Sequence, residues 1–140
     1  MNIDFHFLKK ADLKNRNRLK SFIKDLVKME NKKIIEITYI ICSDRHLLEI
    51  NKKFLSHNYN TDIITFDLST DHTNKIGEIY ISVDRVKVNA KEYNEFIYKE
   101  LHRVIFHGVL HLCGYEDKTK KDASIMREKE DYYLSKYFKN

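Results

Sequence analysis

The sequence contains no proline and only three glycines among its 140 residues. A chain with so few breakers of regular structure is typical of a compact domain built from helices and strands. It also contains only two cysteines, Cys42 and Cys113, which are too few for a disulfide scaffold and do not form a CxxC pair. This usage is consistent with a reducing compartment, so we expect a cytoplasmic protein.

Long apolar runs are missing as well. No stretch of eighteen apolar residues could form a membrane-spanning helix, and the opening "MNIDFHFLKK" has no charged-then-apolar leader. We therefore expect a soluble, unexported protein with no membrane partner. A chain of this size can bury about two-thirds of its unfolded surface. One core is enough for it, so we expect a single domain over residues 1–140.

The spacing of apolar residues predicts four strands and five helices. The strand-like stretches are 3–8, 33–43, 62–68 and 76–83, and the helix-like stretches are 12–30, 44–55, one from about 84, 95–113, and a last one opened by the capping box of Thr119 and Asp122. Ser43 or Asp44 can cap the second helix. Gly114 is expected to stop the fourth helix in a left-handed conformation. That fourth helix carries the densest apolar pattern and is predicted to be central.

Positive charge is concentrated near the N-terminus. The net charge is +5, and residues 1–33 carry ten Lys/Arg against four Asp/Glu. On the helix expected there, cationic side chains recur at every fourth position, where they repel each other unless an anion lies across them. This basic column, our candidate for binding a phosphate backbone, comprises Arg16, Lys20, Lys24 and Lys28. The competing interpretation is an ordinary solvated helix face.

The run "HGVLHLCGYED", residues 107–117, has the pattern of a metal site. His107 and His111 are four residues apart, which on a helix means one turn along and about 40° around, so both rings can reach one point. A catalytic zinc site takes three protein ligands and leaves one position for water. Asp117, three residues beyond Gly114, can supply the third ligand, in the place of the last histidine in the metzincin pattern.

The third ligand has a rival, because the turn after Gly114 is not predictable to one residue. Glu116 is that rival, and we favour Asp117 on the metzincin spacing alone. Cys113 is expected to face away from the two histidines. The competing interpretation of the whole run is a pair of ordinary helix histidines followed by the next helix cap. Four histidines have no partner at metal spacing and are assigned no function: His6, His46, His72 and His102.

The residue after the first histidine is informative. Zinc peptidases with an HExxH motif have their general base there, whereas this chain has Gly108. A peptidase is therefore disfavoured, and a zinc deaminase is excluded because its motif needs proline and paired cysteines. A phosphodiester substrate remains, since a metal ion can activate water and stabilise charge on a phosphoryl oxygen. Gly108 itself could permit close approach of either substrate or sheet.

Three stretches of the chain resemble the YbeY family of bacterial rRNA maturation factors and metal-dependent endoribonucleases. "HGVLHLCGYED" resembles the family's HGxLHLxGYDH signature. "TDIITF", residues 61–66, is similar to its TDVLSF strand, and "GEIYIS", residues 77–82, to its GDIxI segment. The resemblance covers most of the chain and implies an α/β (α+β) fold with a small mixed four-stranded sheet flanked by helices, the fourth of which carries the metal ligands.

The resemblance also implies one zinc ion and action on single-stranded RNA, in small-subunit rRNA processing and ribosome quality control. His107 and His111 match the first two family ligands, while Asp117 occupies the place of the third histidine. A carboxylate adds negative charge, so we expect the metal preference of the site to shift toward harder ions such as Mn²⁺. Glu116 replaces the family's aspartate and is kept as a candidate catalytic residue.

A second departure concerns the arginine that the family has before its TD strand, where this chain has Leu55. His57 is the replacement we choose, as acid/base or phosphate contact, and the competing interpretation is a surface histidine. Asp62 either orients a metal ligand from behind or caps the turn into its strand.

The leading hypothesis is a zinc-dependent endoribonuclease. We expect it to be a monomer whose partners are rRNA and ribosomal or assembly proteins. A rival hypothesis is an RNA-binding assembly factor whose metal is structural, and a metallopeptidase is a third.

Overall fold

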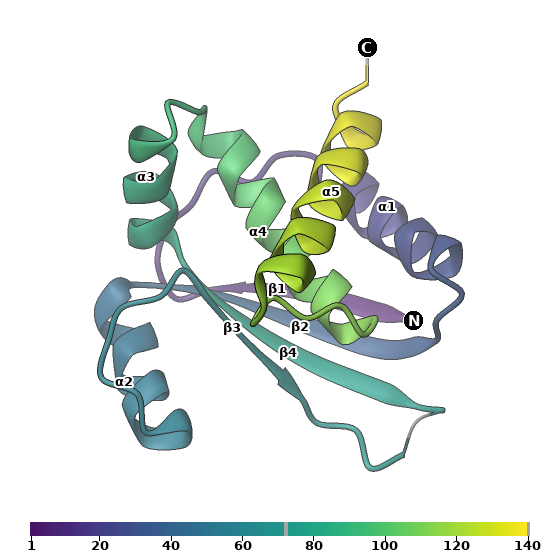
Figure 1. Cartoon of the computed structure of the whole chain (residues 1–140), viewed down its shortest axis with the longest axis horizontal. Coiled ribbons are helices and arrows are strands. Elements are labelled where there is room, and N and C mark those ends of the chain that lie inside the picture. The colour runs from purple at the N-terminus through teal and green to yellow at the C-terminus, as the bar shows by residue number, and fades with distance from the viewer. Residues whose placement is uncertain (72, 140) are drawn as a thin grey trace.

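The computed structural model describes residues 1–71 and 73–139, so His72 lies outside the described residues. The helices are α1 Arg16–Met29, α2 Asp44–Leu55, α3 Val83–Glu92, α4 Ile97–Leu112 and α5 Lys120–Tyr137; the strands are β1 Asn2–Phe7, β2 Ile34–Cys42, β3 Ile63–Asp67 and β4 Lys75–Ser82. The described chain thus contains the four strands and five helices that the sequence predicts (Figure 1).

The four strands form one mixed sheet in the order β1-β2-β4-β3. β1 pairs parallel with β2, and β2 pairs parallel with β4. β3 runs antiparallel to β4, with Ile63 opposite Ile81 and Asp67 opposite Gly77. The small mixed sheet implied by the family resemblance is therefore confirmed. Because β3 is an edge strand, one side of its backbone is left free to border a pocket.

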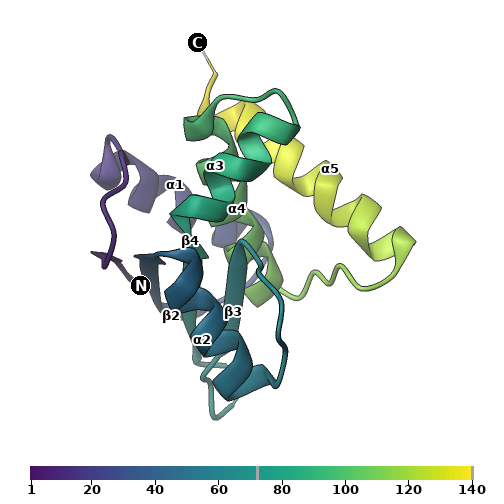
Figure 2. The same cartoon turned by 90° about the vertical axis from the view of Figure 1, so that its left-hand side faces the viewer.

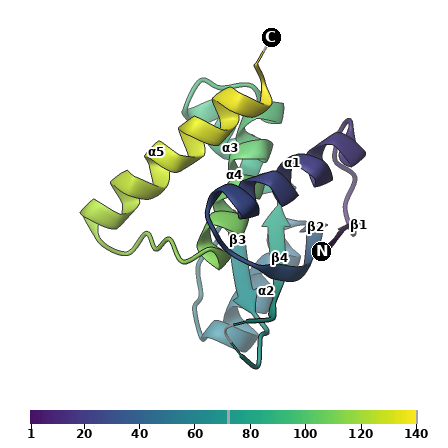
Figure 3. The same cartoon turned by 90° about the vertical axis from the view of Figure 1, so that its right-hand side faces the viewer.

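The helices cover the two faces of the sheet unequally. α2 lies alone on one face, and α1, α3, α4 and α5 lie on the other (Figure 1). In the view of Figure 3, α1 and α5 flank α4, which contacts both of them as well as α3, β3 and β4. The main core fills the space between these helices and the sheet, whereas a small cluster of Cys42, Leu47, Ile50 and Ile64 lies beneath α2. The prediction that the fourth helix is central is confirmed.

Gly108 lets α4 lie unusually close to the sheet. A Cβ atom at this position would come within 2.8 Å of Cδ1 of Ile79 and 3.1 Å of Cδ1 of Ile63. Of the two explanations left open by the sequence, close approach of the sheet is the one that the structure shows. The glycine thereby fixes the distance between β3 and the histidine-bearing face of α4.

The ends of the helices follow the predicted capping residues, with one exception. The hydroxyl of Ser43 accepts a hydrogen bond from the backbone N–H of His46 at the start of α2. The hydroxyl of Thr119 accepts one from the backbone N–H of Asp122 at the start of α5. The helix expected from residue 12 instead begins at Arg16, because Asn15 has a left-handed conformation with φ of 54°. A residue in that conformation cannot continue a right-handed helix toward its N-terminus.

None of the helices within the described residues is both long and apolar enough to cross a bilayer.

Candidate functional site

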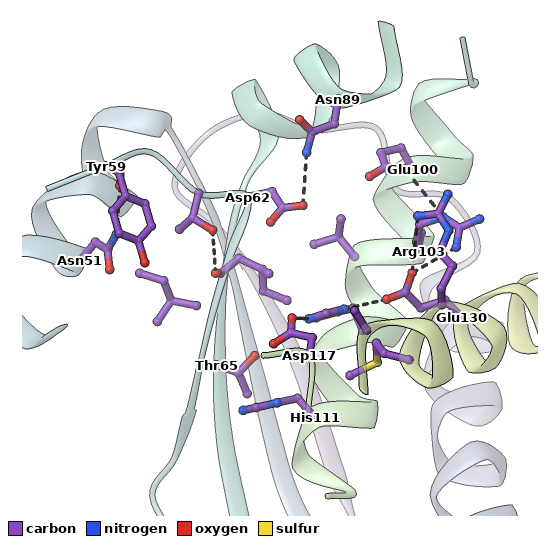
Figure 4. A pocket seen from close by; sticks show the side chains of 18 of the residues that line it. Asn51, Tyr59, Asp62, Thr65, Asn89, Glu100, Arg103, His111, Asp117 and Glu130 are labelled. Atoms are coloured by element: carbon purple, nitrogen blue, oxygen red, sulfur yellow. Dashed lines mark hydrogen bonds and ion pairs between the residues drawn. The ribbon is translucent and has the colours of Figure 1, made fainter. Parts of the chain in front are cut away.

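A pocket of about 530 Å³ lies between α4, the edge strand β3 and the segment that joins α2 to β3. Five of the residues singled out from the sequence line it: His57, Asp62, His107, His111 and Asp117. Leu55, at the position of the family arginine, also lines it. Figure 4 shows Tyr59 and Asn51 on one side of this pocket and Arg103 and Glu130 on the other. The topology thus gathers residues that lie up to 79 positions apart, from Asn51 to Glu130.

His107 is held from behind by a buried carboxylate of α5. Its Nδ1 lies 2.7 Å from Oε2 of Glu130, a residue that is 5% exposed. An ionised carboxylate only accepts hydrogen bonds, so Nδ1 carries the proton and Nε2 is left for the pocket. Burial lowers the pKa of His107, but the hydrogen bond and charge of Glu130 outweigh it and leave this pKa above its ordinary value.

His111 is fixed in the same tautomer by the backbone. Its Nδ1 lies 3.0 Å from the carbonyl oxygen of Tyr115, which also only accepts. This carbonyl is placed by the end of α4, where the N–H of Gly114 donates to His111 O and that of Tyr115 donates to Leu110 O. These two bonds form a Schellman motif, with Gly114 at a φ of 108°. Gly114 therefore ends the helix as predicted, and the turn it makes orients the second histidine.

Asp117 reaches the exposed nitrogen of His107. Its Oδ2 lies 3.3 Å from Nε2 of His107. Two ligands about 2.0–2.1 Å from one tetrahedral ion are themselves separated by roughly 3.3 Å. Glu116 takes a different position: its Oε2 is 3.9 Å from Nδ1 of His111, and it does not line the pocket. The geometry therefore brings Asp117, and not Glu116, to the pocket side of the histidine pair.

The types of side chain present fit a metal site more closely than the distances between them do. Both histidines direct Nδ1 to an acceptor and leave Nε2 available, which is how metal-binding histidines are usually held. Within residues 1–71 and 73–139, however, no set of three His, Cys, Asp or Glu side chains lies close enough together to hold an ion. His107 and Asp117 are already at ligand separation, and His111 would have to complete the set.

Sequence reasoning missed the carboxylate–guanidinium network behind His107. Arg103 contacts three carboxylates: Glu130 at 3.1 Å, Asp131 at 2.7 Å and Glu100 at 3.8 Å. One signal for Glu130 was available, since it stands on the same helical stripe as Met126, Tyr133 and Tyr137, all buried. A carboxylate on a buried stripe needs a partner. The pairing itself joins α4 to α5 across 23 residues and has no local signal.

A second missed group positions the turn that carries Asp117. The carboxylate of Glu30, just after α1, accepts hydrogen bonds from the hydroxyls of Tyr115 and Tyr133 and from Lys129. Burial raises the pKa of Glu30, but these three donors outweigh it and hold the pKa below its ordinary value. Through the side chain of Tyr115, α1 and α5 together anchor the backbone that bonds His111.

Asp62 faces the pocket without contacting either histidine through a hydrogen bond in the described structure. Its Oδ2 accepts from Nδ2 of Asn89 on α3 at 3.3 Å, and its backbone carbonyl accepts from Ser82 N at 2.9 Å. Burial is the main reason why its pKa is raised. The residue that orients a histidine from behind is thus Glu130, and Asp62 joins the start of β3 to α3.

His57 and the basic column lie in different places. The ring of His57 stacks on Tyr59 at the mouth of the pocket, and its Nδ1 lies 3.0 Å from the Tyr59 hydroxyl. The column of Arg16, Lys20, Lys24 and Lys28 lies on α1, and none of its members lines the pocket. Two arginines do line it, Arg103 and Arg127, and the side chain of Arg127 is 54% exposed.

In comparison with known proteins, residues 5–138 of the chain match the family model described as Endoribonuclease YbeY. Proteins named Endoribonuclease YbeY are 48% identical in Cytophaga hutchinsonii, over 88% of this chain and 86% of the relative, and 45% identical in Karelsulcia muelleri, over 94% and 93%. The solution structure of TM1509 from Thermotoga maritima matches with a TM-score of 0.66 at 29% identity, over 99% of this chain and 89% of the other.

Proposed function

The chain belongs to the YbeY family of endoribonucleases, and from this membership we propose that the pocket on α4 is the site where it cleaves RNA. As a member it is a nuclease of rRNA processing that hydrolyses phosphodiester bonds. Our proposal adds that the RNA is single-stranded, that it belongs to the small-subunit rRNA, and that the reaction depends on one zinc ion. We extend it to a role in ribosome quality control in the cytoplasm, as a monomer alongside ribosomal or assembly proteins.

The observation that carries the proposal is the shared arrangement of the two histidines. In each, Nδ1 lies against a fixed acceptor, which leaves Nε2 without that partner, and Oδ2 of Asp117 already lies 3.3 Å from Nε2 of His107. His107, His111 and Asp117 would hold the ion, and zinc bound there would supply a Lewis acid and an activated water. Because Asp117 adds a negative charge, we expect the site to accept Mn²⁺ as well.

The other pocket residues bind and orient the RNA in this proposal. Arg127 is the more exposed of the two arginines, and its contact with a carboxylate is a long one of 3.9 Å from Nη1 to Oε1 of Glu130, so its guanidinium is the one available to a phosphate. Arg103 is committed to three carboxylates and supports Glu130. His57 remains our candidate to protonate the leaving oxygen or to contact a phosphate. Glu116 does not line the pocket, so we assign it a contact with His111 in place of a direct catalytic role.

Replacement of His111 by alanine tests this function against a structural metal. We expect His111→Ala to abolish cleavage of single-stranded RNA, while the protein keeps its fold and its RNA affinity. His6→Ala is the matched control, because His6 is an exposed histidine of β1 outside the pocket. If the metal is structural, His111→Ala will instead unfold the chain.

The ends of the RNA products test the chemical route. Hydrolysis by water predicts products without a 2′,3′-cyclic phosphate, and a product that carries a 2′,3′-cyclic phosphate would contradict that route.

A further inference from the structure

Two exposed rings stand together where the pocket opens between α2 and β3. The rings of His57 and Tyr59 are stacked, with centroids 5.1 Å apart and planes inclined by 22°. Tyr59 remains 56% exposed, and both residues line the pocket that contains His107, His111 and Asp117. Figure 4 places Tyr59 across this pocket from Glu130. The pair therefore forms a flat aromatic surface within the same cavity as the candidate site.

The segment that carries the rings is held by a buried polar side chain. Asn51 of α2 is 1% exposed, and its Nδ2 donates to the carbonyl of Tyr59 at 2.9 Å. The backbone carbonyl of Asn51 accepts from the N–H of His57 at 3.1 Å, after Ser56 has ended the helix with a φ of 55°. These bonds fix the backbone on both sides of the ring pair. The rings are thus positioned in advance although neither is packed into the core.

The surroundings of the pair favour a nucleic acid over a protein side chain. Arg127 lines the same pocket with its side chain 54% exposed, and Lys52 and Lys53 stand in the last turn of α2, just before the segment. Single-stranded nucleic acids bind where aromatic faces lie beside cationic groups, because every base offers a flat face and every linkage a negative charge. In a duplex the base faces are already stacked on one another, so such a surface selects unpaired nucleotides.

We propose that His57 and Tyr59 form a stacking platform for an unpaired RNA base next to the bond that is cut. This proposal rests on the function proposed above, and it adds that the platform contacts a base of the RNA substrate. His57 would then bind RNA through the face of its ring. This role can replace the acid/base role considered for His57 or accompany it. Stacking of one base sets which nucleotide lies across the pocket from the histidine pair.

Equilibrium binding of a short single-stranded RNA, with one abasic nucleotide moved along it, tests the platform without relying on cleavage. Loss of one stacked base typically weakens binding about five- to 150-fold. We expect one abasic position to weaken binding by the wild-type protein in this range, and to have no further effect on Tyr59→Ala. Tyr59→Phe should bind like the wild type because it keeps the ring. His57→Phe should also retain affinity.

Tyr132→Ala is the matched control, since Tyr132 is a similarly exposed tyrosine on α5 that does not line the pocket. The platform is overturned if Tyr59→Ala binds RNA as tightly as Tyr132→Ala does, or if the abasic penalty is the same in Tyr59→Ala and in the wild type. Cleavage of the same RNA is measured separately. A protein that shows the abasic effect but never cleaves retains the platform and loses the proposed nuclease site, so the two failures are distinct.

Discussion

Oε2 of Glu130 lies 2.7 Å from Nδ1 of His107, which joins the middle of α5 to the histidine face of α4. The same carboxylate accepts from Arg103 at 3.1 Å through its other oxygen. Glu130 is therefore a buried carboxylate shared between a guanidinium and an imidazole. The contact sets the tautomer of His107 and ties the orientation of its ring to the packing of α5, which no residue of α4 does alone.

Glu130→Gln should lower the affinity of the protein for zinc. A glutamine keeps the size of the side chain but removes the charge that favours a proton on Nδ1, and loss of such an outer contact typically costs about 10- to 100-fold in metal affinity. Competition titration with a zinc-binding dye measures the change. Glu128→Gln, at an exposed position of the same helix, should bind zinc like the wild type. Equal zinc affinity in the two variants would contradict the role given to Glu130.

Gly108→Ala should destabilise the fold even though alanine favours helices. The added Cβ would lie 2.8 Å from Cδ1 of Ile79, which is fully buried, and overpacking of this kind costs about 1–3 kcal/mol. Urea unfolding measures the loss. Ile79→Val removes the closest atom, so the double variant should be more stable than the sum of the two single changes predicts. Additive losses would show that the contact between α4 and β4 is not the reason for glycine.

Stability should fall as the pH rises through the titration of Glu100. This carboxyl is 4% exposed, and burial raises its pKa to about 7, against the opposing charge of Arg103 and with Asp62 and Glu130 adding to the rise. Because the folded state binds the proton more tightly than the unfolded chain, the stabilisation is complete below the ordinary pKa of 4.5 and is lost by about pH 7.

Glu100→Gln should remove this dependence and leave the protein more stable than the wild type above pH 7, by at most about 3 kcal/mol. Unfolding free energies at several pH values between 4 and 8 measure the difference. Glu92→Gln, at an exposed position of α3, serves as the control and should follow the wild-type curve. A Glu100→Gln curve parallel to that of the wild type would mean that Glu100 titrates normally.

The basic column on α1 should contribute to RNA affinity through charge alone. Each phosphate contact with single-stranded RNA contributes about 0.7 to the slope of log affinity against log salt. Lys20→Gln with Lys24→Gln should therefore reduce the slope by roughly 1.4. The exposed pair Lys136 and Lys139, changed in the same way, should leave it unaltered. If both double variants keep the wild-type slope, the column is an ordinary solvated face.

The parts of the fold and site that follow local rules were predictable from the sequence. The spacing of four between His107 and His111 places both on one face of α4, and the conformational freedom of Gly114 ends that helix where predicted. The start of α1 was not predictable, because the spacing of apolar residues does not reveal that Asn15 adopts a left-handed conformation. The strands were recognised by composition, whereas the mixed pairing came from the family resemblance.

The support of the site depends on contacts between elements that are distant in sequence. Glu130 reaches His107 only because α5 packs on α4, and Glu30 reaches Tyr115 across 85 residues. The orientation of His57 depends on Asn51, a polar residue whose burial the amphipathic pattern of α2 does not reveal. Such contacts arise from how the elements pack, which periodicity along the chain does not specify.

Metal-dependent cleavage tests the central claim most directly. The protein is stripped with a chelator, and cleavage of single-stranded RNA is followed as Zn²⁺ is added back, with Asp117→Ala treated in parallel. We predict no cleavage by the stripped protein, recovery that saturates at one equivalent of zinc, and weak or absent recovery in Asp117→Ala. Full cleavage by the metal-free protein, or equal recovery in Asp117→Ala, would contradict the assignment of His107, His111 and Asp117 as the site of a catalytic ion.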